Sequence, residues 1–329
     1  MKEIVINSLN AHQRADKFVR KFLNEAPLSF IYKVFRKKDV KVNGKWIKES
    51  YILCEGDILR IYVTDEQVEE FNKPKNIENI KSDLAIIYED ENILIINKPK
   101  GILVHGDINE KRITLSNQVQ AYLYKKGEFK NDGKGFIPSP CHRLDRNTSG
   151  LIVYAKNVES SQIMMNLLQS HVEIEKYYLL LVDGKTEEEG EINAPLLKDE
   201  ESGFVKVASI KDGAKSAKTL YKKIDTNGKY SLVYAKLLTG RTHQLRVHFQ
   251  YIKHPILGDD KYGNFQLNKE FSNIFNYKNQ FLHAFKLKFN NIPGKLNYLS
   301  DKEFVALLPN KEREIITKLS LKIKMPKDF

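Results

Sequence analysis

The sequence has few cysteines and no long apolar run. Cys54 and Cys141 lie far apart and fit neither a disulfide framework nor the paired spacing of a zinc site. No stretch approaches the roughly 18 apolar residues of a membrane-spanning helix, and the N-terminus lacks the apolar core of a signal peptide. We therefore expect a cytoplasmic protein with no disulfide, no metal and no membrane association.

Acidic residues are outnumbered, and the basic excess is concentrated. The 329 residues carry 54 Lys and Arg against 42 Asp and Glu, a net charge of +12. Residues 1–63 hold thirteen Lys or Arg and seven Asp or Glu, which is half of that excess. Concentrated basic charge favours a polyanionic partner such as nucleic acid. The length favours one large domain with a small one beside it.

Two short helices are predicted near the N-terminus. In residues 14–23, apolar side chains recur at the spacing of one helix face. Ser29 can cap a second helix, whose Lys33, Arg36 and Lys37 point outward. The second helix is therefore expected to present a basic face.

A hairpin and a closing strand follow. Asn43 and Gly44 stand between two short alternating runs, and both tolerate the positive φ of a type I′ turn. Residues 57–63 predict a strand. The pieces "QRADKFVRKFL", "KVNGKWI" and "EGDILRIYV" resemble the alpha-L RNA-binding motif, the module named after ribosomal protein S four. The alternative is a small α+β cap with a solvated basic face. The residues that we expect to contact RNA here are Arg14, Lys33, Arg36, Lys37, Lys41 and Lys45.

The rest of the chain predicts a linker, a larger domain and a tail. Residues 64–82 have mixed charge and no periodicity, which is typical of a linker. In residues 83–310, strand-like runs alternate with turns and helical segments without a regular βαβ rhythm, which favours the α+β class. The strand-like runs include "LAIIYED", "NILIINKP", "LIVYAK", "KYYLLLVDG" and "YSLVYAKLLT". Residues 311–329 predict a basic C-terminal tail.

The stretch "HRLDRNTSGL" places Asp145 between two arginines. A carboxylate is ionised at neutral pH, and burying it without a cation costs several kcal/mol. Arg143, Arg146, Arg241 and Arg246 are the candidate partners, because a guanidinium can hold a carboxylate in bidentate geometry. From the residues alone, Asp145 is either half of a structural ion pair or a catalytic group.

Four stretches together resemble the RluA family of RNA pseudouridine synthases, in its RluC/RluD-like branch. They are "YEDENILIINKPKGILVH", "HRLDRNTSGLIVYAKN", "EKYYLLLVDG" and "TGRTHQLRVHF…HPILGDDKYG", which follow in this order between residues 84 and 290. The resemblance implies a mixed, largely antiparallel sheet flanked by helices. It also implies an isomerase that converts uridine to pseudouridine in RNA without a metal or organic cofactor.

The resemblance implies a role for each residue of the site. Asp145 is expected to be the nucleophile, attacking either the sugar or the base, with Arg241 as its ion-pair partner. In "KYY", Tyr178 is expected to stack on the uracil and to take or relay a proton, with Tyr177 as the alternative. An ordinary phenol is a poor base at neutral pH, so stacking is the firmer role.

Base flipping is a further requirement, because the uridine must leave its stack before its glycosidic bond can be reached. His142, Arg143 and Arg146 are expected to contact the RNA backbone or to fill the vacated position. We expect ribosomal RNA or a ribosomal subunit precursor as partner, and no obligatory protein partner. Large-subunit (23S) ribosomal RNA is the expected substrate. The alternatives are a transfer-RNA pseudouridine synthase and a catalytically silent ribosome-assembly factor.

Two rival chemistries fit the sequence less well. Cys141 and His142 are adjacent, and adjacent side chains on an extended chain point to opposite sides, which argues against a thiol nucleophile. His243, His248 and His254 are spaced by five and six residues, which does not place metal ligands on one helix face. The paired acids of "LGDDKYG" are interpreted as a structural turn near the active site.

Overall fold

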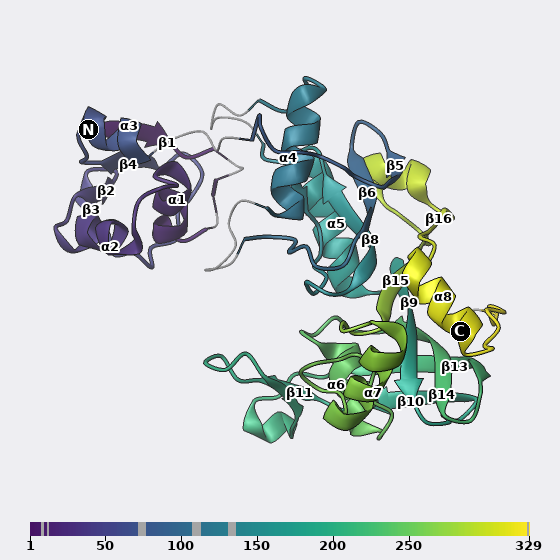
Figure 1. The fold of residues 1–329 in the computed structure, drawn as a ribbon. Coiled ribbons are helices and arrows are strands. Elements are labelled where there is room, and N and C mark those ends of the chain that lie inside the picture. Colours follow the sequence, from purple (N-terminus) through teal and green to yellow (C-terminus); the bar gives the residue numbers. More distant parts are fainter. Residues whose placement is uncertain (8–9, 12, 72–76, 107–112, 131–135, 328) are drawn as a thin grey trace. The chain divides into compact units, whose positions relative to one another are not determined.

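The computed structural model describes residues 1–7, 10–11, 13–71, 77–106, 113–130, 136–327 and 329. The chain divides into two compact units (Figure 1). The N-terminal unit comprises Met1–Asn76 with Gly127–Gly135, and the large unit comprises Ile77–Lys126 with Phe136–Phe329.

The N-terminal unit is a four-stranded antiparallel sheet packed against helices. The strands lie in the order β1-β4-β2-β3. Their bounds are β1 Lys2–Val5, β2 Val40–Val42, β3 Lys45–Trp46 and β4 Ile58–Ile61. The helices are α1 Ala15–Phe22, α2 Leu28–Arg36 and α3 Asp65–Phe71. Val19, Ile31 and Val34 meet Leu59 and Ile61 of the sheet in one apolar core, which fixes the helices on the sheet.

The predicted helices and hairpin of this unit are confirmed, with one correction. Asn43 and Gly44 have φ angles of 49° and 81°, and Val42 pairs with Lys45, as a two-residue type I′ turn requires. The prediction that Ser29 caps the second helix is wrong. That helix starts one residue earlier, at Leu28, so Ser29 lies inside its first turn.

Part of the segment predicted as a linker is helical. Helix α3 begins after Thr64, whose hydroxyl accepts from the Gln67 backbone N–H while the Gln67 side chain accepts from the Thr64 N–H. This reciprocal pair is a capping box. Val68 of α3 is buried in the core of the N-terminal unit. The helix is so short that its periodicity is weak, but the capping residues are readable in the sequence.

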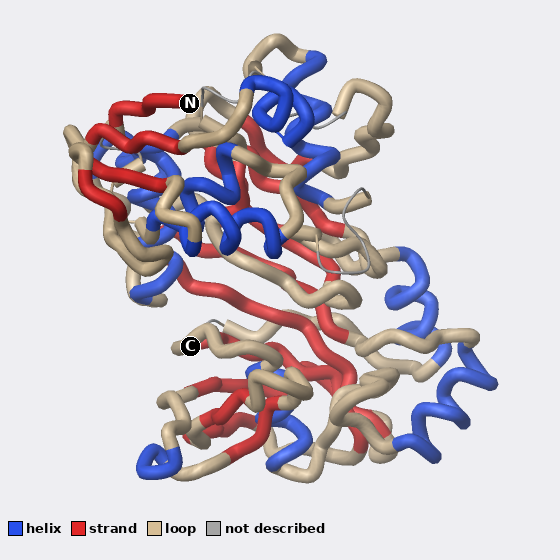
Figure 2. Tube along the Cα trace, turned by 90° about the vertical axis from the view of Figure 1, so that its left-hand side faces the viewer, coloured by secondary structure: helices blue, strands red, loops and turns tan. Residues whose placement is uncertain are grey.

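The large unit is built on one ten-stranded sheet. Its strands follow the order β10-β13-β14-β9-β15-β8-β6-β5, with β16 beside β15 and β7 beside β8. The bounds are β5 Ile86–Glu89, β6 Ile93–Lys98, β7 Ser139–Pro140, β8 Ser149–Ala155, β9 Ile174–Asp183, β10 Glu189–Asn193, β13 Lys218–Thr226, β14 Tyr230–Leu237, β15 Leu282–Phe289 and β16 Glu303–Val305. A separate hairpin pairs β11 Leu196–Lys198 with β12 Val205–Val207. Figure 2 colours these strands red.

Among the strand pairs of this sheet in the described residues, β15 with β8 is parallel and the others are antiparallel. The predicted α+β class with a largely antiparallel sheet is therefore confirmed. All five strand-like runs picked from the sequence are strands, namely β5, β6, β8, β9 and β14.

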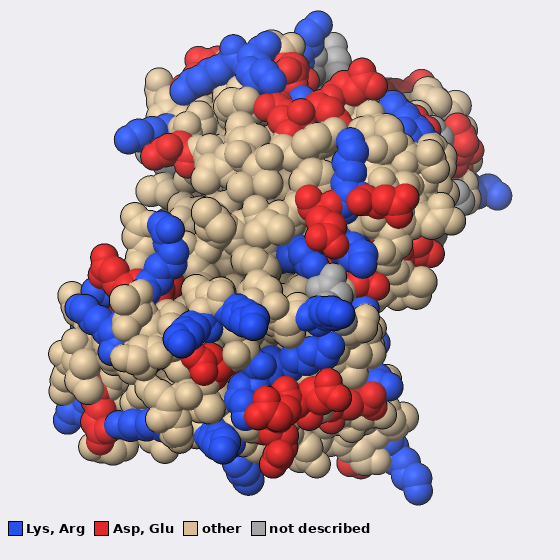
Figure 3. Space-filling model, turned by 90° about the vertical axis from the view of Figure 1, so that its right-hand side faces the viewer, with Lys and Arg blue, Asp and Glu red and all other residues tan. Residues whose placement is uncertain are grey.

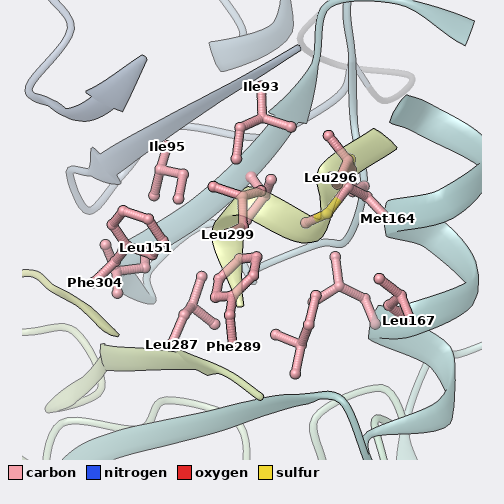
Figure 4. Packing of buried hydrophobic residues seen from close by; sticks show 14 of the residues in the cluster. Ile93, Ile95, Leu151, Met164, Leu167, Leu287, Phe289, Leu296, Leu299 and Phe304 are labelled. Carbon is pink, nitrogen blue, oxygen red and sulfur yellow. The ribbon is translucent and has the colours of Figure 1, made fainter. Parts of the chain in front are cut away.

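Helices cover both faces of the sheet near β6 and β8. Helix α5, Val158–Ser170, packs Met164 and Leu167 against Leu287 and Phe289 of β15, and these side chains point into a shared core (Figure 4). Helix α4, Leu115–Lys125, lies on the other face, where its Ser116 hydroxyl is 3.2 Å from the hydroxyl of Tyr154 on β8. The remaining helices are α6 Gln244–Tyr251, α7 Phe265–Phe275 and α8 Asn310–Lys318.

The segment predicted as a basic C-terminal tail is packed on the large unit. Helix α8 buries Ile315 and Ile316, and its buried Glu312 lies 2.7 Å from Lys100 Nζ. This apolar face is short and is surrounded by basic residues in the sequence, so it was not predicted. No helix in the described part of the chain combines the length and apolar character needed to cross a membrane.

Candidate active site

A cavity of about 1220 Å³ opens in the large unit. Drug-sized ligands typically occupy roughly 300–1,000 Å³, so the space exceeds that of a small-molecule site. Asp145, Tyr178, Arg241, His243 and Arg246 all line it. They come from the loop before β8, from β9 and from the segment between β14 and the first turn of α6.

Lys98 holds the loop that carries Asp145 in place. The buried Lys98 ammonium donates to the carbonyls of Pro99, Ile102 and Arg146, each at 2.9 Å. The N–H of Gly101 donates to the same Arg146 carbonyl. Burial lowers the pKa of Lys98 to about 7, while the nearby Asp145 carboxylate opposes that shift. Lys98 was not predicted from the sequence, although a lysine ending an apolar strand is a visible signal.

Lys98→Met is expected to lower the free energy of unfolding and to make that free energy less dependent on pH. Between about pH 7 and 10 the unfolded chain holds a proton on Lys98 that the folded protein has lost. Stability therefore rises with pH in this window, by up to about 1.4 kcal/mol per pH unit for one such lysine. Methionine removes this contribution. It also leaves buried carbonyls without their donor, at a cost of about 1–3 kcal/mol each.

The measurement is urea unfolding at pH 7, 8 and 9. Burial also lowers the pKa of Lys176 to about 7 and that of Lys100 to about 8, so the slope of the variant should shrink rather than vanish. Lys278→Met, at an exposed lysine, is the control and should keep the wild-type slope. Equal slopes for Lys98→Met and wild type would contradict this account.

Glycine allows the strand after Asp145 to approach its neighbour closely. Gly150 has a φ of +110°, and an added Cβ would lie 2.2 Å from the Ala284 carbonyl oxygen on β15. No other residue fits there without moving the backbone. Ser149 next to it binds the His283 ring at 2.9 Å. Ser149 and Gly150 thus fix the position of β8 and of the loop before it.

Arg246 is the cation that pairs with Asp145. Its Nη1 lies 3.1 Å from Asp145 Oδ2, and the two side chains are 7% and 29% exposed. The prediction that Arg241 forms this pair is wrong in this structure. Arg241 precedes α6, is exposed, and donates from Nε to the Ser216 carbonyl at 2.9 Å. Arg246 lies in the first turn of α6 on its buried side, which brings its guanidinium to the carboxylate.

The Arg246 guanidinium is itself held by a buried acid. Its Nε and Nη2 donate to the two oxygens of Asp259 at 2.7 and 2.8 Å. Asp259 Oδ1 also accepts from the N–H groups of Lys261 and Tyr262. Although burial opposes it, the carboxylates of Asp259 and Asp145 raise the pKa of Arg246, so the guanidinium stays charged. Asp259 thus anchors the arginine, as expected of a structural turn near the site.

The geometry separates the two tyrosines of "KYY". Tyr178 faces the cavity with Asp145, whereas Tyr177 faces the other side of the sheet and stacks on Tyr234 at 5.1 Å. Burial, and then the charge of Asp145, raise the pKa of Tyr178. Tyr178 is therefore a neutral phenol at neutral pH, suited to stacking more than to removing a proton.

His243 is a second neighbour of Asp145. Its Nε2 is 3.9 Å from Asp145 Oδ2, and its Nδ1 is 2.8 Å from the Tyr262 hydroxyl. The Tyr262 oxygen already accepts from the Val205 N–H. We therefore assign the Tyr262 hydroxyl as the donor to His243 Nδ1, which places the ring proton of His243 on Nε2. Burial lowers the pKa of His243, although Asp145 opposes the shift. A neutral histidine thus directs an N–H toward the carboxylate.

The other predicted contacts of this unit also line the cavity. Arg143 and Arg146 are exposed, whereas His142 Nε2 accepts from the Val153 N–H at 3.1 Å. Burial, then the nearby Lys176 and His171, lower the pKa of His142 to about 3, so this ring is neutral. Burial raises the pKa of Cys141 to about 12, and a thiol that stays protonated does not suit a nucleophile.

The other two histidines considered as metal ligands, His248 and His254, make structural contacts. His248 bonds Thr219 and the Ala194 carbonyl at 2.9 and 3.0 Å, and His254 bonds the Asp183 carbonyl at 2.7 Å. No group of three or more potential metal-binding side chains occurs among the residues that the structure describes.

The basic residues predicted in the N-terminal unit differ in their availability. Lys33, Arg36, Lys37 and Lys45 are exposed on α2 and on the hairpin. Lys41 lies over the Tyr62 ring at 4.8 Å. Arg14 instead forms a bidentate pair with Asp16, with both distances at 3.0 Å. Arg14 is therefore already neutralised within its own unit.

Known proteins resemble this chain over most of its length. The family model described as RNA pseudouridylate synthase matches residues 92–251. A Vibrio vulnificus protein named ribosomal large subunit pseudouridine synthase C is 35% identical over 85% of this chain and 86% of its own. A Mycoplasma capricolum protein named an uncharacterized RNA pseudouridine synthase is 31% identical over 93% of this chain and 97% of its own.

A solved structure shares the fold. Human RNA pseudouridylate synthase domain containing 4 has a TM-score of 0.58 at 23% identity, covering 74% of this chain and 95% of that one. The family model and the named relatives thus assign this fold to the class of RNA-modifying isomerases. The chain belongs to the RNA pseudouridylate synthase family.

Proposed function

We propose that this protein isomerises specific uridines of large-subunit (23S) ribosomal RNA, with Asp145 as the nucleophile. The supporting observation is the Asp145 carboxylate, fixed by Arg246 at 3.1 Å in a cavity that Tyr178 also lines. The relatives named for ribosomal large-subunit pseudouridine synthesis support the choice of RNA.

The reaction moves one bond from nitrogen to carbon. The N-glycosidic bond breaks, the uracil turns while it stays bound, and carbon 5 bonds to the sugar. Carbon 5 then loses a proton, and nitrogen 1, which left the sugar, gains one. Asp145 serves this sequence by adding to the sugar or to the base and leaving again. Arg246 holds the carboxylate in a fixed orientation. Tyr178 stacks on the uracil, and the released Asp145 carboxylate accepts the proton from carbon 5.

The target nucleotide must be extruded from its stack, at a cost of a few kcal/mol. Arg143 and Arg146 are exposed at the cavity and are suited to phosphates or to the vacated stack. His142 is neutral and bonded to the backbone, so it shapes the wall rather than supplying charge.

The N-terminal unit supplies additional RNA affinity in this proposal. Its exposed Lys33, Arg36, Lys37 and Lys45 suit phosphate contacts. On the face of the molecule drawn in Figure 3, basic and acidic side chains are interspersed, so the net charge of +12 does not form one continuous basic surface there. A tethered module raises the effective concentration of RNA at the cavity.

The experiment compares substrates. Unmodified large-subunit ribosomal RNA and transfer RNA are incubated separately with the protein, and pseudouridine is mapped at nucleotide resolution. The proposal expects new pseudouridine at discrete positions of the ribosomal RNA. Modification of transfer RNA alone would contradict ribosomal RNA as the substrate. Modification of neither RNA would favour a binding factor without catalytic activity.

Removing residues 1–76 is expected to weaken RNA binding by about ten-fold or more, while the large unit keeps its fold. The cut follows α3, because that helix packs on the N-terminal unit. Loss of several phosphate contacts should also flatten the dependence of affinity on salt. Filter binding at several salt concentrations and circular dichroism test both points. Unchanged affinity would exclude the N-terminal unit from RNA recognition.

A further inference from the structure

Lys98, Lys100 and Lys176 of the large unit differ in how their donors are used. Lys98 satisfies its three donors with three carbonyls, and Lys100 pairs with Glu312 at 2.7 Å. Lys176 is only 6% exposed, yet among the residues that the structure describes it makes a single hydrogen bond, to the Leu168 carbonyl at 2.9 Å. An ammonium group has three donors. Lys176 also lines the cavity, so its unused donors have access to a ligand there.

A second polar group lies beside Lys176. Nδ1 of His171 is buried and has no hydrogen-bond partner in the described part of the chain. Gly240 borders both side chains, since an added Cβ would lie 2.9 Å from His171 Nε2 and 4.0 Å from Lys176 Nζ. His171, Lys176 and Gly240 therefore converge on one part of the cavity wall.

The charges in this region have one sign. After burial, the largest influences on His171 are the charges of Lys176 and Arg241, which lower its pKa to about 4. Lys176 and His171 likewise lower the pKa of His142. The acids of the cavity, by contrast, gather around Arg246. His171 is neutral, so the charged groups of this region are the cations Lys176 and Arg241, and together with the unused donors they favour an anion.

We propose that Lys176 and His171, with Arg241 beside them, form a subsite for a phosphodiester group next to the target uridine. Lys176 and Tyr178 are two residues apart on the same face of β9, about 7 Å along the strand. With the uracil on Tyr178 and the sugar at Asp145, the phosphate of the same nucleotide reaches Lys176. The inference rests on the proposed function and adds the group that positions the flipped nucleotide.

The test measures how RNA affinity depends on salt. Full-length wild type, Lys176→Met and His171→Asn are titrated with the large-subunit RNA fragment that wild type modifies, between about 50 and 200 mM salt. Asparagine is chosen because His171 has a φ of 58°, which asparagine tolerates. Lys176→Met is expected to bind roughly ten-fold more weakly. Its slope of log affinity against log salt should fall by roughly 0.7 to 1, as for one lost phosphate contact.

A matched control separates this role from a structural one. Lys236 on β14 is also buried, at 9% exposed, but it pairs with Glu175 at 3.0 Å and is not among the residues that line the cavity. Lys236→Met should keep the wild-type slope. Lys176→Met should melt close to wild type, because the loss of the hydrogen bond to the Leu168 carbonyl is offset by the removal of a buried amine. A lower melting temperature with an unchanged salt slope would assign Lys176 a structural role and overturn the subsite.

Two further outcomes also decide the matter. If inorganic phosphate raises the melting temperature of wild type but not of Lys176→Met, while their RNA slopes agree, the subsite takes free anions and the phosphodiester proposal fails. If wild type modifies no RNA, the proposed function fails first. If wild type modifies RNA and the slopes agree, the subsite alone is rejected.

Discussion

Arg246→Met is expected to abolish pseudouridine formation and to destabilise the large unit. The guanidinium contacts Asp145 and the buried Asp259, so its loss leaves two carboxylates without their cation. Breaking a buried ion pair by removing one partner costs about 3–5 kcal/mol. Arg246→Lys should recover part of the stability but little of the rate, because lysine cannot hold both acids in a planar geometry.

Arg241→Met is the variant to compare with Arg246→Met, because the sequence predicted Arg241 as the partner of Asp145. Its side chain is exposed and bonds one carbonyl, so the free energy of unfolding should change by no more than about 0.5 kcal/mol. The measurements are urea unfolding and single-turnover pseudouridine formation at saturating enzyme. If Arg241→Met loses the chemical step while Arg246→Met retains it, the ion pair described here is not the one that supports catalysis.

The strands and the hairpin were accessible from sequence because their signals are local. The buried strands β6, β8, β9 and β14 are apolar runs of strand length, and Asn43 and Gly44 carry the φ preference of their turn. Helix α3 was missed, since seven residues hold too little periodicity, although its capping box was readable. Local signals thus predict individual helices and strands, but they do not predict the order of the strands in the sheet.

The choice between arginines depends on geometry that sequence spacing does not contain. Arg241 and Arg246 lie five residues apart, and only the start of α6 after His243 decides which one turns inward. The same holds for Lys98, whose three acceptors include the carbonyl of Arg146, far away in the chain. By contrast, Tyr178 could be separated from Tyr177 by pattern, and strand alternation places them on opposite faces.

Asp145→Asn is expected to remove the activity without unfolding the protein. Asparagine keeps the size and can still accept a hydrogen bond from Arg246, which remains paired with Asp259. The Asp145 side chain is 29% exposed, so little burial energy changes. Loss of an anionic nucleophile should lower the rate by a factor of at least about 10³, as when other enzymes lose theirs. RNA affinity should stay within a few-fold of wild type.

The most direct measurement of the central claim is pseudouridine mapping on large-subunit ribosomal RNA after incubation with wild type and with Asp145→Asn at matched, RNA-saturating concentrations. Circular dichroism and RNA binding confirm that both proteins are folded and engaged. The account predicts new pseudouridine at discrete positions with wild type and none with Asp145→Asn. Equal modification by the two proteins would contradict Asp145 as the nucleophile.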